Sequence, residues 1–299
     1  MDKMLSDKPL RSLWVGSGLL CLAALSWSTA GLFPRLVSTD VFTTLFWRSL
    51  LGGLSVLALQ LAVFGRSSNR PFWQTGPAEK IMSGLSASAM ICFIAAFYFA
   101  TVADVVFVYS AFPILTIVFS SLLLRTGIPR IDVFCACIVA MGVAIILWGQ
   151  TSAHSVFGTA LSLAATVLFA LLTIGIKRHP EADMVKVTYV GAFISAAAML
   201  PFSSFANTTV LNTAWLWLYG FLNIGVGFGL FLLGVRHVNA TMASLICMIE
   251  IPLAPLWTYV LFDERVPPQT LMGGAIIVSA VVISLARPAK QAVTTSATG

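Results

Sequence analysis

The most restrictive feature of the sequence is a series of ten apolar stretches, each about 20 residues long, separated by charged and turn-forming residues. A continuous apolar stretch of that length satisfies its backbone hydrogen bonds in lipid only as a helix that crosses the hydrocarbon core. The stretches run over 13–33, 42–64, 79–101, 105–124, 131–149, 156–176, 184–205, 213–235, 240–262 and 269–286. The sequence therefore predicts an all-α membrane protein with ten transmembrane helices.

The composition leaves no room for a soluble domain. Of the 299 residues, 59% are hydrophobic and 9% are charged, whereas soluble chains are about 25% charged. This excludes a cytoplasmic enzyme, a disordered chain and a nucleic-acid-binding protein. The five cysteines lie within apolar stretches, which predicts buried thiols and neither a disulfide framework nor a metal site. We expect no cofactor.

Basic residues orient the chain, because cytoplasmic loops of membrane proteins carry an excess of lysine and arginine. With the N-terminus in the cytoplasm, Arg35 and Arg265 fall in outside loops and Arg48 lies within a span. The other fourteen of the 17 basic residues fall on the inside: Lys3, Lys8, Arg11, Arg66, Arg70, Lys80, Arg125, Arg130, Lys177, Arg178, Lys186, Arg236, Arg287 and Lys290. The sequence therefore predicts a plasma-membrane protein, in bacteria an inner-membrane protein, with both termini cytoplasmic.

The chain also contains an internal repeat. An offset of 139 residues places Pro113 on Pro252 and Pro129 on Pro268 without gaps. Two halves of five spans each would have opposite orientations in the membrane, which is a recurring plan of secondary transporters. The predicted organisation is a cytoplasmic segment 1–12, repeats over 13–149 and 155–286, and a polar, disordered cytoplasmic tail over 287–299.

Four short segments resemble the EamA repeat of the drug/metabolite transporter superfamily. They are residues 27–31 (WSTAG), 48–53 (RSLLGG), 250–255 (EIPLAP) and 262–265 (FDER). The resemblance implies two inverted five-helix repeats around a central cavity, lined mainly by spans 1, 3, 4, 6, 8 and 9. The chain departs from the pattern at Arg125, where an acidic residue is usual. Among members, it is most similar to the aromatic amino-acid exporters of the YddG type.

Glu250 is the outstanding candidate for a functional residue, because it is a carboxylate near the middle of the ninth span. A charge at that depth costs about 2.5–3.5 kcal/mol on insertion scales. Glu250 either forms a structural ion pair with Arg48, the one basic residue away from the ends of a span, or takes part directly in substrate or proton binding. Their depths along the helices permit a pair without establishing one.

Pro113 and Pro252 each lie within a span, and a proline inside a helix removes a hydrogen bond and bends it. Kinks at equivalent positions of both repeats would suit a gate, although membrane helices also tolerate proline generally. Tyr109, Pro113 and Thr116 share one helical face that could line a cavity. A threonine in that position can instead bond back to its own helix.

Four further residues complete the candidates for substrate contact or gating: Trp27, Tyr98, Asn223 and Trp257. Trp27 has small neighbours on its face, so its indole could stack on an aromatic substrate or simply pack against a helix. Asn223 lies beside several glycines of the eighth span, where close helix packing is the favoured interpretation.

The first functional hypothesis is an exporter of small amphipathic metabolites, with amino acids including aromatic ones as substrates, working by alternating access. The alternative is an exporter of other small metabolites or drugs. An intramembrane enzyme is disfavoured because His154, His179 and His237 lie at loops or helix ends without partners at ligand spacing. We expect no catalytic residue and no ATPase subunit, since no phosphate-binding loop is present. The expected partners are a small-molecule substrate and the lipid bilayer, with the protein as a monomer.

Overall fold

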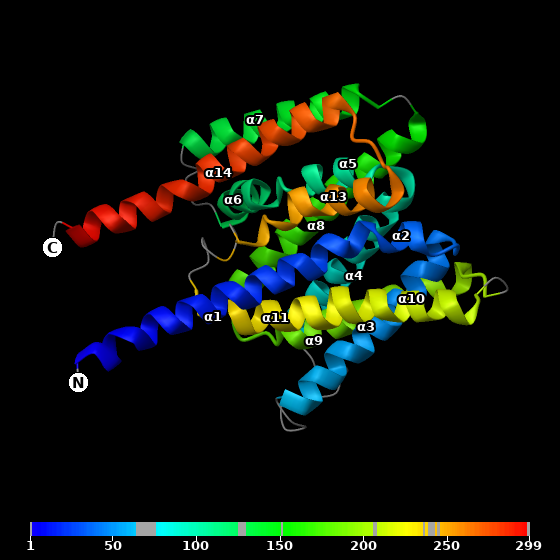
Figure 1. Ribbon diagram of the computed structural model, residues 1–299, viewed down its shortest axis with the longest axis horizontal. Coiled ribbons are helices and arrows are strands. Elements are labelled where there is room, and N and C mark those ends of the chain that lie inside the picture. The colour runs from blue at the N-terminus through cyan, green and yellow to red at the C-terminus, as the bar shows by residue number, and fades with distance from the viewer. Residues whose placement is uncertain are drawn as a thin grey trace.

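The computed structural model describes residues 2–63, 76–124, 130–150, 152–205, 208–235, 237–238, 243 and 246–297. Within these residues every regular element is a helix. Figure 1 shows a bundle of long helices with both ends of the chain at the same side of the molecule. The predicted positions Arg66, Arg70, Arg125, Pro129 and Arg236 lie outside the described residues.

The first half of the chain contains five spans, three of them unbroken. The elements are α1 (Asp2–Ser28), the 3₁₀ turn η1 (Thr29–Gly31), α2 (Phe33–Leu36), α3 (Val41–Val63), α4 (Pro77–Phe99), α5 (Val102–Tyr109), α6 (Phe112–Leu124) and α7 (Arg130–Trp148). The first span is α1 with η1 and α2, and the fourth span is α5 with α6. Arg35 was expected in a loop but belongs to α2, because the first span continues to Leu36.

The second half begins with a helix across the predicted boundary at 155. Its elements are α8 (Ala153–Arg178), α9 (Met184–Met199), the 3₁₀ turn η4 (Leu200–Phe202), α10 (Val210–Gly220), the π-helix η5 (Phe221–Val226), α11 (Gly227–Gly234), α13 (Glu250–Phe262) and α14 (Pro268–Ala297). The tail was expected to be disordered from residue 287, yet α14 continues through it to Ala297.

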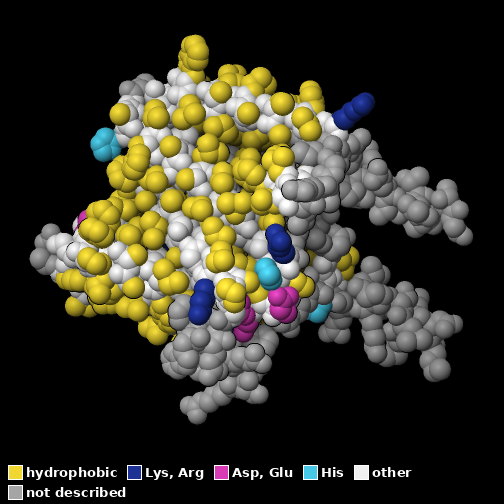
Figure 2. Space-filling view, turned by 180° about the vertical axis from the view of Figure 1, so that it is seen from behind, with side chains coloured by type: hydrophobic (Ala, Val, Ile, Leu, Met, Phe, Trp, Pro, Cys, Tyr) yellow, Lys and Arg dark blue, Asp and Glu magenta, His cyan; other side chains and the backbone are white. Residues whose placement is uncertain are grey.

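Ten helical segments correspond to the ten predicted spans. Seven of them are long and apolar enough to cross a membrane, and Val133–Trp148 and Pro268–Ser284 are shorter apolar helices. The tenth is α13. Hydrophobic side chains cover most of the face in Figure 2, and large apolar residues such as Trp148 and Val260 are exposed on the surface. Such a surface suits lipid rather than water.

The packing of the helices relates the two halves. The third span packs on the sixth through α4 and α8, and the first packs on the eighth through α1 and α11. Exchanging the halves converts one of these pairs into the other. The contacts of α7 with α14 and of α3 with α9 join further pairs of spans across the two halves. The contact pattern is thus that of two five-helix repeats related by approximate two-fold symmetry.

Glycines set the closest of these approaches. A Cβ on Gly142 of α7 would lie 2.8 Å from the carbonyl oxygen of Gly273 in α14, and a Cβ on Gly273 would lie 2.6 Å from that of Gly142. Only residues without a side chain allow two helices this near each other.

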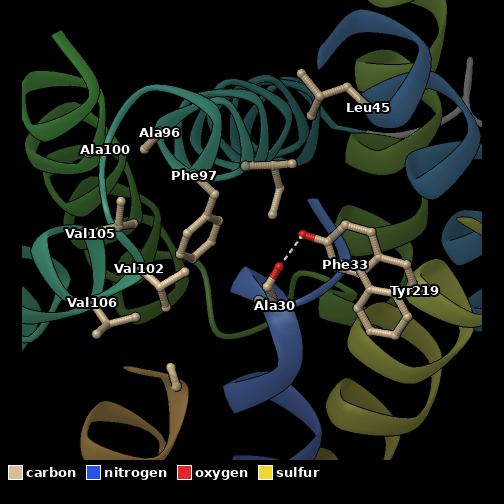
Figure 3. Packing of buried hydrophobic residues seen from close by; sticks show 12 residues of the cluster. Ala30, Phe33, Leu45, Ala96, Phe97, Ala100, Val102, Val105, Val106 and Tyr219 are labelled. Carbon is tan, nitrogen blue, oxygen red and sulfur yellow. Dashed lines mark hydrogen bonds between the residues drawn. The ribbon is translucent and has the colours of Figure 1, made fainter. Parts of the chain in front are cut away.

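The largest buried apolar cluster lies where both repeats meet. Figure 3 shows Phe33 stacked on Tyr219, with their ring centroids 4.6 Å apart, and the Tyr219 hydroxyl bonded to the carbonyl of Ala30 at 2.8 Å. Phe97 of α4 and Val102 of α5 complete this side of the cluster. The core therefore ties η1 and α2 to α10 and fixes the residues around it.

Candidate functional site

The fourth and ninth spans are both broken at equivalent positions of the two repeats. α5 ends at Tyr109 and α6 begins at Phe112, whereas α13 begins at Glu250 after a turn at 248–249. The offset of 139 residues carries Phe112 to Ile251, one residue from the observed start of α13. Discontinuous helices at equivalent positions are a feature of transporter binding sites.

The two matched prolines begin helices and do not kink them, in contrast to the expectation. Pro113 is the second residue of α6 and Pro252 is the third residue of α13. Proline is well tolerated in the first helical turn, because its missing N–H would have no intrahelical partner there. The proline inside α13 is Pro255, which is equivalent by the same offset to Thr116.

Glu250 opens α13 at the break in the ninth span. An acidic residue there is favoured by the positive end of the helix dipole. Its side chain is half-buried, and Tyr109 and Cys247 are its electrostatic neighbours. Among the residues that the structure describes, none donates a hydrogen bond to this carboxylate. The break thus leaves a half-buried carboxylate at the start of α13 with no donor from the described residues.

Arg48 lies in α3 and is only 5% exposed. Its Nη2 approaches Oδ1 of Asn223 at 3.5 Å, and its Cζ lies 4.8 Å from the centroid of the Tyr219 ring. Its Nε and Nη1 atoms are buried without a hydrogen-bond partner. The structure does not bring Arg48 and Glu250 together as an ion pair: within the described ranges, the polar partners of the Arg48 guanidinium are Asn223 and Tyr219. We call these three residues the Arg48 site.

Asn223 holds the eighth span against the first. Its Nδ2 donates to the carbonyl of Ser26 at 3.1 Å and to Oγ1 of Thr29 at 3.5 Å. It belongs to the π-helix η5, whose wider turn places an additional residue on this face. Nothing in the local sequence marks η5 as a π-helix.

The tryptophans Trp27 and Trp257 use their N–H groups for packing. Trp27 donates to the carbonyl of Asn223 at 3.0 Å, and a Cβ on Gly227 would lie 2.5 Å from its Nε1. Trp257 of α13 donates to Oγ of Ser28 at 2.9 Å. Both contacts hold α1 between α13 and the eighth span.

Tyr109 stands in an aromatic cluster beside the break in the fourth span. Its ring centroid lies 4.9 Å from that of Phe93, 5.8 Å from that of Phe169 and 6.1 Å from that of Phe112. The cluster joins α4, α5 and α6 to α8 of the second repeat. Thr116, by contrast, bonds back to the carbonyl of Phe112 at 2.8 Å, so its hydroxyl is held by its own helix.

Arg35 and Glu264 join the two repeats at the end of the bundle opposite the termini. Nε of Arg35 donates to Oε2 of Glu264 at 3.0 Å, and its Nη1 and Nη2 donate to the carbonyls of Phe97 and Ala100. The other oxygen of Glu264 accepts the backbone N–H of Val102 at 2.7 Å. We call this set the Arg35 joint. Sequence reasoning missed it, although Arg35 and Arg265, the neighbour of Glu264, were both assigned to outside loops.

A cavity of about 360 Å³ opens beside the Arg35 joint. Its lining comprises Pro34, Arg35, residues 97–101 and Ser155. Tyr98, which was predicted to contact substrate or act in gating, is one of these, and its hydroxyl donates to Oγ1 of Thr44 at 2.5 Å. Thr44 lies one helical turn before Arg48 in α3. Through Tyr98 and Thr44, the lining of the cavity is therefore bonded to α3 one turn from Arg48.

Comparison with known proteins identifies the architecture. The sequence matches the EamA-like transporter family twice, over residues 14–148 and 156–286. An uncharacterized transporter of Archaeoglobus fulgidus is 25% identical over 281 residues, which cover 92% of this chain and 97% of that protein. A protein of known crystal structure has 18% identity and a TM-score of 0.63, covering 90% of this chain and 96% of its own, which supports the fold alone.

Neither of these relatives has a stated substrate, so the likeness to aromatic amino-acid exporters stays a prediction. The double family match spans nearly all ten helices and places the protein among transporters rather than enzymes. The chain belongs to the EamA-like transporter family, within the drug/metabolite transporter superfamily.

Proposed function

We propose that the protein is a secondary exporter of small amphipathic metabolites, amino acids including aromatic ones, and that it works by alternating access. Membership of the EamA-like family supports transport as such. The equivalent breaks in the fourth and ninth spans are the observation that carries the mechanism. In a broken span, the helix after the turn can tilt without bending the helix before it. Each repeat would therefore have a hinge at an equivalent position.

The Arg35 joint supports a particular assignment of states. It ties α2 and α4 of the first repeat to the end of α13 in the second, at the end opposite the termini. With both termini in the cytoplasm, this end faces outward. The joint is then intact while the protein is closed to the outside, and it parts when substrate is released.

The aromatic cluster around Tyr109 supports aromatic amino acids as substrates. Rings of α4, α5, α6 and α8 gather beside the break in the fourth span, and aromatic faces favour offset or edge-on contact with another ring. The rearrangement of α6 during transport would open this cluster to a substrate side chain.

Counterflow into liposomes that contain only the purified chain tests the proposal. Labelled phenylalanine, tryptophan, alanine and threonine are compared with a nucleoside and a cationic dye, without ATP. We expect uptake of amino acids, with the aromatic ones preferred. Uptake by this chain alone would also agree with a monomer that needs no ATPase subunit. Failure with every amino acid would remove the substrate assignment and leave the fold unaffected.

Glu250 is the candidate for proton coupling, because it is a carboxylate at the broken span without a hydrogen-bond donor among the described residues. Glu250→Gln should abolish accumulation driven by a pH gradient while counterflow continues. Glu181→Gln is the matched control, since Glu181 is largely exposed beside His179. Undiminished gradient-driven accumulation in Glu250→Gln would exclude coupling through this residue.

Glu250 also favours the alternative substrate class. The carboxylate of Glu250 would attract a cationic drug as readily as it would attract the ammonium group of an amino acid. If the dye is transported and the amino acids are not, the protein is a drug exporter, and Glu250→Gln should then remove dye uptake.

A further inference from the structure

The Arg48 site contains more hydrogen-bonding capacity than the protein uses. A guanidinium carries five N–H groups and no acceptor. Among the described residues, Nη2 of Arg48 alone meets an acceptor, at 3.5 Å, while Nε and Nη1 are buried without a partner there. The ion pairs of the described residues lie elsewhere, at Arg35, His179 and Arg265. The guanidinium therefore lacks a counter-anion within the described part of the chain.

A buried charge without a counter-ion is unfavourable, particularly at the depth of a membrane. The Tyr219 ring under the guanidinium offsets part of this through its negative face. Asn223 contributes one dipole. Neither group carries a negative charge, so an anion that reaches Arg48 would gain a charge-assisted interaction that the protein itself does not provide.

The position of the guanidinium is fixed by packing. A Cβ on Gly220 would lie 2.5 Å from the carbonyl oxygen of Arg48, so this glycine allows α10 to touch the backbone of α3 at that residue. Tyr219 and Asn223, on either side of Gly220, then hold one face and one nitrogen of the side chain. With that face covered, an anion must approach along an edge of the plane, and each edge includes an unpartnered nitrogen.

We infer that Arg48 is a substrate-binding residue that takes the carboxylate of the transported molecule. The inference rests on the proposed function and extends it to the group that is recognised. A carboxylate matches the flat edge of a guanidinium through two parallel hydrogen bonds. Its single negative charge also equals that of one arginine, whereas a phosphate dianion would bring an uncompensated charge into the membrane.

The access path follows from the contacts at the cavity. Tyr98 lines the cavity beside the Arg35 joint, and its hydroxyl bonds to Thr44, which is one helical turn from Arg48 in α3. Separation of these two side chains, when the Arg35 joint parts, exposes Arg48 to the cavity. In an exporter the ligand then leaves Arg48 by this path, and the path closes when the bond forms again.

A pair of isosteric ligands tests the inference on the purified protein. 3-Phenylpropionate and 3-phenylpropionamide differ in charge and scarcely in shape, and neither has an ammonium group. We expect the acid to raise the melting temperature and to bind about tenfold to a hundredfold more tightly than the amide, as a charge-assisted hydrogen bond requires. Equal binding of both, or binding of neither, would overturn the inference without any variant.

The substitution Arg48→Gln then assigns the preference to this side chain. In Arg48→Gln the acid should bind no better than the amide, and Arg48→Lys should retain part of the preference. Arg265→Gln is the matched control, because Arg265 is largely exposed, and it should keep the full preference. A preference for the acid that persists in Arg48→Gln would overturn the inference, and size-exclusion profiles show that each variant is folded.

The experiments can contradict the proposed function without contradicting this inference, and the reverse. If the wild type transports no amino acid in counterflow but still prefers the acid to the amide through Arg48, the amino-acid assignment is wrong and the carboxylate site stands. If amino acids are transported equally well by wild type and Arg48→Gln, the transport assignment stands and the carboxylate site is wrong.

Discussion

Arg35 and Arg48 are separated by 13 residues in the sequence and meet opposite environments in the same protein. All three nitrogens of Arg35 donate to oxygen atoms, and one of these belongs to the carboxylate of Glu264. Arg48 is more deeply buried, yet two of its nitrogens have no partner among the described residues. An unpaired charge is more unfavourable at the more deeply buried position, and it is Arg48, at that position, whose charge is unpaired.

The difference separates two uses of a buried cation. A guanidinium whose donors are all occupied by the protein acts as a structural joint, and removing it leaves a carboxylate and two carbonyls without their partner. A guanidinium whose donors are free contributes little to the stability of the resting fold. Its position is explained by a ligand that arrives later. The two arginines should therefore respond to the same substitution in opposite ways.

The largest effect is expected for Arg35→Gln. This change removes the cation of the Arg35 joint and should lower the free energy of unfolding by about 2 kcal/mol, the range of one or two hydrogen bonds to a charged group at a partly buried site. Thermal unfolding in detergent measures it. In a cysteine-free background, an added Ala100→Cys should also react faster with an impermeant maleimide, because the joint no longer closes this end.

Glu264→Gln serves as the control for that result. It preserves an acceptor for the Val102 N–H and removes only the negative charge, so its effect should be smaller than that of Arg35→Gln. If both variants unfold like the wild type and the thiol introduced by Ala100→Cys stays protected, the Arg35 joint does not hold this end closed.

Arg48→Gln should leave stability unchanged or raise it, by up to about 1 kcal/mol. A buried charge without a counter-ion carries a desolvation penalty that no attraction offsets, and a neutral side chain at the same position removes that penalty. The measurement is the same thermal unfolding, without ligand. A loss of stability equal to that of Arg35→Gln would mean that Arg48 is a second joint, and the contrast between the two arginines would disappear.

Much of the fold could be predicted from sequence, because the signals that specify it are local. Apolar length located the ten spans, and the offset between Pro113 and Pro252 located the equivalent positions at which α6 and α13 begin. The prolines were nevertheless interpreted as kinks. A proline in an apolar stretch is compatible with a kink within one helix and with the start of a new helix, and the turn before Pro113 decides between them.

The candidate site was less predictable, because it depends on lateral position. Depth along two helices allowed Arg48 and Glu250 to pair, but only the packing of α3 against α10 and η5 shows that Arg48 meets Tyr219 and Asn223. Arg35 and Glu264 are 229 residues apart and two of the acceptors of Arg35 are backbone carbonyls. Every residue has a backbone carbonyl, so residue types do not show which carbonyls accept from an arginine. The Arg35 joint therefore could not be predicted from the sequence.

A smaller effect is expected at Asp104, which forms a second connection between the repeats at the same end. Its Oδ1 accepts from Thr270 of α14 at 2.6 Å and its Oδ2 accepts from Thr101 at 2.7 Å. Asp104→Asn retains one acceptor and should cost about 1 kcal/mol. A double-mutant cycle with Thr270→Val isolates the contact between the repeats. A coupling energy near zero would mean that the Asp104–Thr270 contact does not stabilise the association of the repeats at this end.

The smallest effect is expected for Arg265→Gln, which compares Arg35 with an exposed arginine at the same end of the bundle. Arg265 is adjacent to Glu264 in the sequence, but its Nε lies 4.0 Å from Oδ1 of Asp263 and both side chains are mostly exposed, at 85% and 76%. Such a pair is screened by water, so stability should change by less than about 0.5 kcal/mol. A larger loss would show that any positive charge at this end supports closure. An unchanged melting temperature, beside a clear loss in Arg35→Gln, would assign the effect to the bonded geometry of Arg35 and not to its charge alone.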